Sequence, residues 1–107
     1  MSSERVDLDP SLAGELSDLE RRAIEVHVLR ARADGIRGPR RGERALRLAL
    51  RASELEQQLL EDAGLERGAE LLRIMLDHPA TVAAVERWRY AQELAYRIMK
   101  DMPDSRS

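Results

Sequence analysis

Hydrophobic residues recur every three or four positions along most of this chain, which is the spacing of one face of an α-helix. After an acidic N-terminal arm over residues 1–16, the first such segment covers about 18–34. Its apolar positions include Leu19, Ala23, Val26 and Ala33. Ser17 followed by Glu20 is the Ser-x-x-Glu pattern that caps the start of a helix. Gly35 is predicted to end this helix in a left-handed conformation.

A second helix is predicted over about 43–63, after a loop at 35–42 that contains three glycines and a proline. Its apolar positions form a heptad-like seam: Ala45, Leu48, Ala52, Leu55 and Leu59. A second apolar flank consists of Leu46, Leu50 and Leu60. A stripe this wide exceeds what one neighbouring helix covers.

Gly64 separates a third helix, predicted over about 66–77, and Pro79 begins a fourth, predicted over 79–102. Residues 71–76 are apolar on nearly every side, which predicts burial in the bundle or at a subunit contact. The predicted inner face of the fourth helix comprises Val85, Trp88, Ala91, Ala95, Ile98 and Met102.

These segments predict an all-α protein, a single domain over 1–107 that forms a four-helix up-and-down bundle. Only 3% of the residues are aromatic, so aliphatic side chains must fill the core, which suits helix packing better than a sheet. Because the apolar flanks exceed what one bundle hides, we expect homodimerisation to complete the fold.

Charge is strongly segregated, although the formal net charge is only −2. Residues 1–20 carry six acidic residues against one arginine, whereas residues 21–53 carry ten arginines against three acidic residues. Residues 54–107 are acidic again. A basic belt between two acidic regions is the most informative feature of the sequence.

This belt comprises Arg30, Arg32, Arg37, Arg40, Arg41, Arg44, Arg47 and Arg51. The spacing of Arg40, Arg44, Arg47 and Arg51 places them on one helix face. With Leu46 and Leu50, the arginines from Arg37 to Arg51 are the predicted partner-binding residues. Three interpretations remain open: an acidic protein surface, nucleic acid, or a solvated face with intrahelical ion pairs such as Glu43–Arg47.

The segment 71–90 ends a short helix and begins the next with Pro-Ala-Thr-Val, and it resembles a helix-turn-helix DNA-binding motif. The resemblance implies that Thr81, Arg87 and Arg89 lie toward DNA. Leu76 stands where the turn usually has glycine, and Asp77 where it has an apolar residue.

No catalytic residue, metal site or cofactor is predicted. His27 and His78 have no carboxylate three or four residues away, cysteine is absent, and no phosphate-loop or nucleophile-elbow pattern occurs. His27 is interpreted as a partly buried residue at the edge of the core. No apolar run is long enough to span a membrane and residues 1–5 do not begin a signal peptide, so a cytoplasmic location is expected.

The sequence thus predicts a regulatory or protein–protein interaction module whose partner is acidic or apolar-faced. The alternative is a nucleic-acid-binding regulator or packaging-type protein that uses the basic belt or residues 71–90. A small helical enzyme is the least favoured class.

Overall fold

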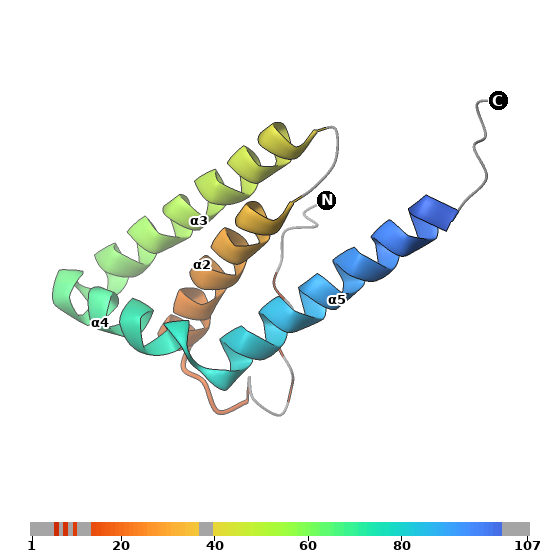
Figure 1. The fold of residues 1–107 in the computed structure, drawn as a ribbon. Coiled ribbons are helices and arrows are strands. Elements are labelled where there is room, and N and C mark those ends of the chain that lie inside the picture. Colours follow the sequence, from red (N-terminus) through yellow and green to blue (C-terminus); the bar gives the residue numbers. More distant parts are fainter. Residues whose placement is uncertain (1–5, 7, 9, 11–13, 37–39, 102–107) are drawn as a thin grey trace.

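The computed structural model describes residues 6, 8, 10, 14–36 and 40–101. In that part of the chain it contains four helices of 12 residues or more and no strand (Figure 1). The helices are α2 (Asp18–Gly35), α3 (Arg41–Ala63), α4 (Leu65–Leu76) and α5 (Pro79–Asp101). Every boundary lies within two residues of the position that the hydrophobic pattern predicts.

Helix α2 begins with the predicted capping box at Ser17. The Ser17 hydroxyl accepts a hydrogen bond from the Glu20 backbone N–H (3.2 Å), and the Glu20 carboxylate accepts one from the Ser17 N–H (2.8 Å). The bond from the Ser17 backbone, followed by that from its side chain, lowers the pKa of Glu20 because both favour the charged carboxylate. The cap therefore fixes the start of α2.

Helix α2 is the centre of the fold, since it packs against α3, α4 and α5. It buries side chains on several sides: Ala23, Ile24, Val26, Val28 and Leu29. One cluster joins Val26 and Leu29 to Ala52 and Leu55 of α3. The other cluster joins the remaining α2 residues to buried residues of all three neighbours: Leu59, Leu71, Met75, Ala80 and Ala84. Val6 and Leu8 of the N-terminal arm also pack against this core.

Gly64 makes the corner between α3 and α4. Its φ of +91° is the one positive φ among the described residues, and its N–H donates to the Leu60 carbonyl oxygen at 2.9 Å. At the same time its own carbonyl oxygen accepts from the Gly68 N–H at 2.8 Å. One residue therefore ends α3 and starts α4, in a conformation that only glycine adopts without strain.

The predicted up-and-down order holds for α2 and α3, which lie antiparallel (Figure 1). It does not extend to α5, which runs in the same direction as α2. Helix α3 ends beside the start of α2, and the short helix α4 crosses the bundle there, so α5 begins at the same end as α2. A connection this short cannot reverse the chain along the full length of the bundle.

Gly35 ends α2 as predicted, but the expected left-handed cap is wrong. The following residue, Ile36, is extended, and Gly35 has no positive φ. The reason for glycine here is close packing: a Cβ at this position would lie 2.7 Å from two ring carbons of Trp88 on α5. The end of α2 therefore lies directly against Trp88.

The second half of α5 departs most from the prediction. Ala80, Thr81 and Ala84 are buried against the bundle, and Trp88 is half-buried. Ala91, Ala95 and Ile98, which the spacing assigns to the inner face, are exposed, and Met102 lies outside the described residues. The periodicity is correct, but none of the helices that the structure describes lies beside that part of α5.

We expect Gly64→Ala to lower the free energy of unfolding by about 1–3 kcal/mol, because alanine would be strained at this φ. Gly42→Ala is the matched control: Gly42 lies in the first turn of α3, and no atom within 4 Å would meet its Cβ. That control should leave stability unchanged or raise it by up to about 1 kcal/mol. Urea titration followed by circular dichroism measures both variants, and equal effects would contradict this account of the corner.

The lowered pKa of Glu20 predicts a pH-dependent contribution from the cap. Because the folded-state pKa lies below the usual value of 4.5, Glu20 stabilises the fold above that pH and loses this effect as the pH falls. Glu20→Gln should therefore cost a few tenths to about 1 kcal/mol at pH 7. The difference in the free energy of unfolding between Glu20→Gln and the parent chain should be smaller at pH 3 than at pH 7, as measured by parallel urea titrations.

Candidate functional site

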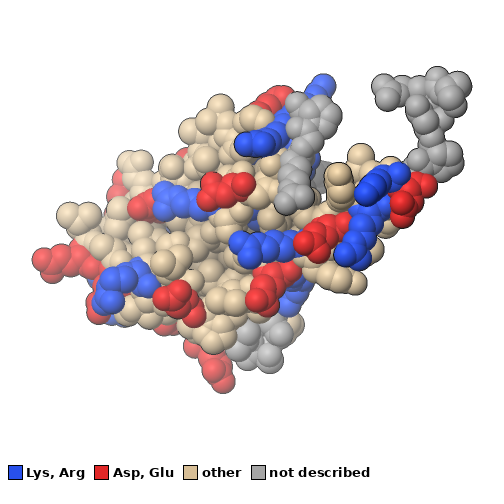
Figure 2. Space-filling view, viewed as in Figure 1, with Lys and Arg blue, Asp and Glu red and all other residues tan. Residues whose placement is uncertain are grey.

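Four arginines line one face of the first half of α3: Arg40, Arg44, Arg47 and Arg51. The Arg44 N–H donates to the Arg40 carbonyl oxygen at 3.0 Å, so Arg40 stands one turn before Arg44 even though it precedes the helix. All four side chains are exposed. We call this set the arginine face. Figure 2 shows acidic and basic side chains mixed over one side of the molecule, with basic side chains projecting where α3 begins.

Ion pairs divide the basic belt into two parts. Arg30 of α2 pairs with Glu56 of α3, so this member of the belt joins the two helices. At one end of the arginine face, Arg51 lies 3.4 Å from Glu54. The α2 part of the belt is thus engaged within the fold, through at least Arg30.

The part of the basic belt at the start of α3 differs from the α2 part in its ion pairing. Arg40, Arg41, Arg44 and Arg47 form no ion pair with any other residue that the structure describes. The intrahelical pair expected between Glu43 and Arg47 does not form. Arg37 lies outside the described residues. Among the described residues, the arginines at the start of α3 are therefore exposed and form no ion pair.

Two leucines accompany the arginine face. Leu46 and Leu50 are 60% and 56% exposed and lie one turn apart on the side of α3 away from Ala52 and Leu59. They are not part of the core seam. An exposed leucine pair beside unpaired arginines combines apolar area with directional donors, as the cores and rims of protein interfaces do.

The helix-turn-helix resemblance does not hold at Thr81. The segment does have the expected order of helix, turn and helix, since α4 ends at Leu76 and α5 begins at Pro79. Thr81, however, is 4% exposed, and its hydroxyl donates to the Met75 carbonyl oxygen at 2.6 Å. The expectation that Thr81 faces DNA is wrong, because the first turns of α5 pack against the bundle.

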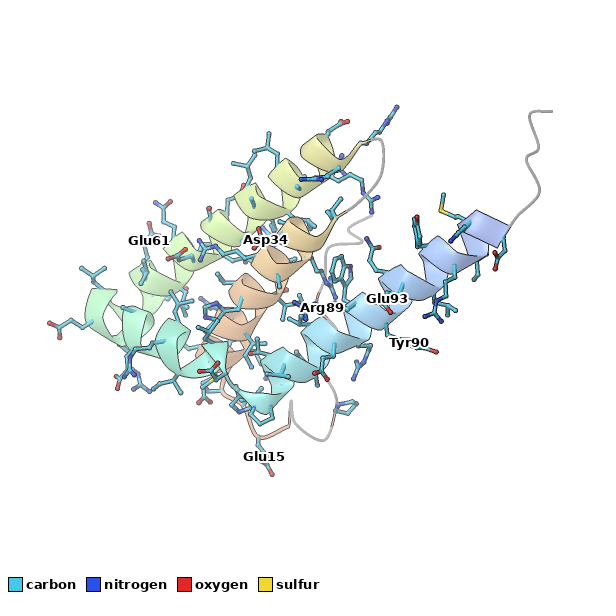
Figure 3. The ribbon with its side chains drawn as sticks, in the orientation of Figure 1. Glu15, Asp34, Glu61, Arg89, Tyr90 and Glu93 are labelled. Atoms are coloured by element: carbon cyan, nitrogen blue, oxygen red, sulfur yellow. The ribbon has the colours of Figure 1, made fainter. Side chains whose placement is uncertain are left out.

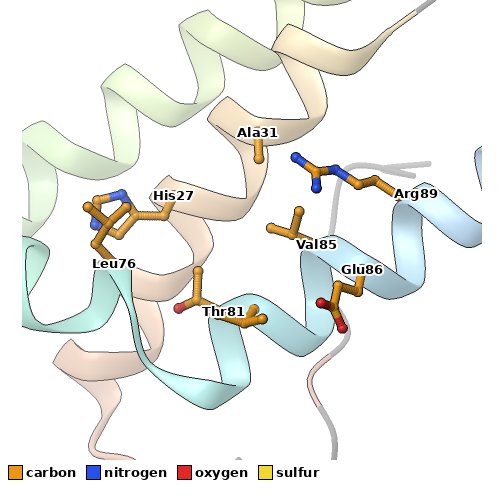
Figure 4. A pocket seen from close by; sticks show the side chains of 8 residues that line it. His27, Ala31, Leu76, Thr81, Val85, Glu86 and Arg89 are labelled. Carbon is orange, nitrogen blue, oxygen red and sulfur yellow. The ribbon is translucent and has the colours of Figure 1, made fainter.

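An open pocket of about 240 Å³ lies between α2 and the beginning of α5 (Figure 4). It is lined by His27, Ala31, Leu76, Thr81, Val82, Val85, Glu86 and Arg89. His27 is half-buried and its Nε2 lies 2.5 Å from the Leu72 carbonyl oxygen, a contact that holds α2 to α4. This geometry supports the interpretation of His27 as a residue at the edge of the core, because its Nε2 is already engaged.

A second candidate surface contains three residues that the sequence assigned to the interior, Ala91, Ala95 and Ile98. It consists of Ala91, Leu94, Ala95, Ile98 and Met99 on the free half of α5, which we call the α5 stripe. All five residues are exposed, Met99 by 73%. Tyr90 and Glu93 lie on the same protruding half of the helix (Figure 3). The signal in the sequence is length: the predicted fourth helix is longer than the predicted first helix, so part of it extends past its neighbour.

Because Arg44 and Arg47 are exposed and form no ion pair with another described residue, we expect Arg44→Gln with Arg47→Gln to change the free energy of unfolding by less than about 0.5 kcal/mol. A small gain is expected, since like charges one turn apart repel. Thermal or urea unfolding measures this. A loss of more than about 1 kcal/mol would mean that these arginines stabilise the fold and are not held free for a partner.

Other signals of function were sought in the part of the chain that the structure describes. No group of three or more His, Cys, Asp or Glu side chains there could hold a metal ion, and no helix there is long and apolar enough to cross a membrane. Comparisons with protein-family models, with curated proteins and with solved structures gave no match. Function is therefore inferred from the exposed surfaces of α3 and α5.

Proposed function

We propose that this protein is a helical interaction module, acting as a homodimer, that binds an acidic, apolar-faced protein helix through the start of α3. The observation that carries the proposal is that Arg40, Arg44 and Arg47 form no ion pair with any other described residue and lie beside the exposed Leu46 and Leu50. Like charges one turn apart repel each other, and a cluster of such charges on an exposed face is typical of a binding surface.

The two kinds of residue have different roles in this proposal. Burial of Leu46 and Leu50 against a partner removes apolar area from water and supplies affinity. The guanidinium groups orient a carboxylate-bearing partner and raise the rate of encounter. A partner helix with leucines on one side and glutamates beside them matches both requirements.

Nucleic acid fits the same surface less well. Phosphates also accept from guanidinium groups, but single-stranded binding sites add aromatic side chains on which bases stack. The aromatic residues of this chain are Trp88, Tyr90 and Tyr96, all of which lie on α5 and not on α3. The net charge of −2 also gives the molecule no general attraction for a polyanion.

The test uses a synthetic amphipathic peptide of Glu and Leu as the protein probe and a duplex DNA of similar length as the rival probe. Fluorescence anisotropy should show binding of the peptide in the micromolar to hundred-micromolar range. Arg44→Glu with Arg47→Glu should weaken this binding tenfold or more, equivalent to about 1.4 kcal/mol. Leu46→Ala with Leu50→Ala should also weaken it.

Arg67→Glu with Arg73→Glu is the matched control, because it makes the same charge change on exposed residues of α4. This control should bind the peptide nearly as well as the parent chain. Equal losses in both double variants would show that only net charge matters. Tighter binding of the DNA, falling steeply with salt, would replace the proposal with the nucleic-acid function.

A further inference from the structure

The α5 stripe continues a face that is already a packing surface. Ala80 and Ala84 are buried on it, Trp88 is half-buried, and Ala91, Ala95 and Ile98 follow at spacings of three and four. The exposed part therefore belongs to the same side of the helix as the part that packs against α2. What changes along α5 is the presence of a neighbour.

The neighbour ends at a defined point. Helix α2 runs in the same direction as α5 and ends at Gly35, which lies against the ring of Trp88. Helix α5 continues from Trp88 to Asp101, a length of about 20 Å at 1.5 Å per residue. There is thus room for another helix along the α5 stripe, beyond the end of α2.

We propose that the free half of α5 pairs with the same segment of a second copy of this chain, in antiparallel orientation. The inference rests on the homodimer that is part of the proposed function, and it identifies the surface and geometry of that dimer. It does not involve the arginine face, so the two surfaces can be tested separately.

The position of α2 selects the orientation. In a parallel pair, the α2 helices of both copies would need the same space between the two α5 helices, because each α2 covers the inner face up to Trp88. In an antiparallel pair, the two bundles lie at opposite ends. Each α5 then fits beyond the end of the other copy's α2, and the two-fold symmetry closes the assembly.

The same contact sets the register. Alignment of Ala95 with Ile98 of the second copy places a small residue opposite a large one, and symmetry repeats this contact. Gln92 then lies beside Met99 of the second copy on one flank. A shift by one heptad would bring Ile98 of the second copy to Trp88, where Gly35 already packs.

At the contact between the two copies, the tip of α5 meets the C-terminal end of α2. The C-terminal end of α2 presents partly negative backbone carbonyls, with the exposed Asp34 beside them (Figure 3). The tip of α5 carries Arg97 and Lys100 against one acidic residue, Asp101. Arg32 also lies in the last turn of α2, so the attraction in an antiparallel pair is between this basic tip and the partly negative carbonyl groups that end α2 in the other copy.

The interface uses about a dozen residues from each copy, so it falls at the small end of specific interfaces and should give a dissociation constant of about 1–100 µM. Sedimentation equilibrium of the full chain over this range should show a mass rising from monomer toward dimer. Ile98→Glu should raise the dissociation constant at least tenfold, because it places a charge in the stripe.

Val82→Glu is the matched control for this substitution. Val82 is an exposed aliphatic residue of α5 that lies outside the stripe, and the change in charge is the same. Val82→Glu should dimerise as the parent chain does. A parent chain that stays monomeric at the highest concentration, or equal effects of the two substitutions, would overturn the inference.

Orientation is tested by disulfide formation, since the chain has no cysteine of its own. Chains with Gln92→Cys and chains with Met99→Cys are mixed and oxidised. The antiparallel register expects mixed disulfides well in excess of either homodimer. A parallel pair would instead give both homodimers, and this result would overturn the proposed geometry.

The two proposals fail in different ways. Ile98→Glu should abolish dimerisation, yet the resulting monomer should still bind the Glu and Leu peptide through its own arginine face. A parent chain that dimerises but does not bind the peptide would count against the proposed peptide-binding function only. A parent chain that binds the peptide but stays monomeric would count against the homodimer and its α5 contact, and would leave the peptide-binding role of the arginine face in place.

Discussion

Helix α2 is enclosed by α3, α4 and α5, and the removal of its apolar side chains from water is the interaction on which the other helices depend. Both core clusters include α2 residues, whereas the helices around it contribute fewer buried side chains each. The neighbours are thus held in place mainly through α2. Its length, 18 residues, consequently limits how far the bundle extends.

The surfaces left for binding follow from this limit. Helices α3 and α5 have 23 residues each, so neither is matched by α2 along its whole length. The second half of α5 therefore passes beyond the bundle with its apolar stripe uncovered. Leu46 and Leu50 are exposed for a different reason, since they lie on the side of α3 that faces away from α2. The described part of the chain therefore presents at least two apolar surfaces, one on α3 and one on α5.

Charge separates the residues that hold the fold from those available for contact. Arg22 pairs with Asp62 of α3 and with Asp18, and the bond to Asp62 chiefly raises the pKa of Arg22. Together with Arg30 and Glu56, this pair links α2 to α3 across their surface. Exposed ion pairs of this kind contribute little to the free energy of unfolding. They show, however, that Arg22 and Arg30 are paired within the fold. The arginines at the start of α3 form no such pair with any other residue that the structure describes.

The sequence by itself determined the helix boundaries, the capping box at Ser17 and the common face of the four arginines, because these depend on spacing within one segment. It could not determine that α5 runs parallel to α2 or that Thr81 is buried, since both follow from how α4 crosses the bundle. The exposure of Ala91, Ala95 and Ile98 was likewise decided by tertiary structure. A helical period shows which residues share a face, whereas the length and path of the neighbouring helices decide whether that face is covered.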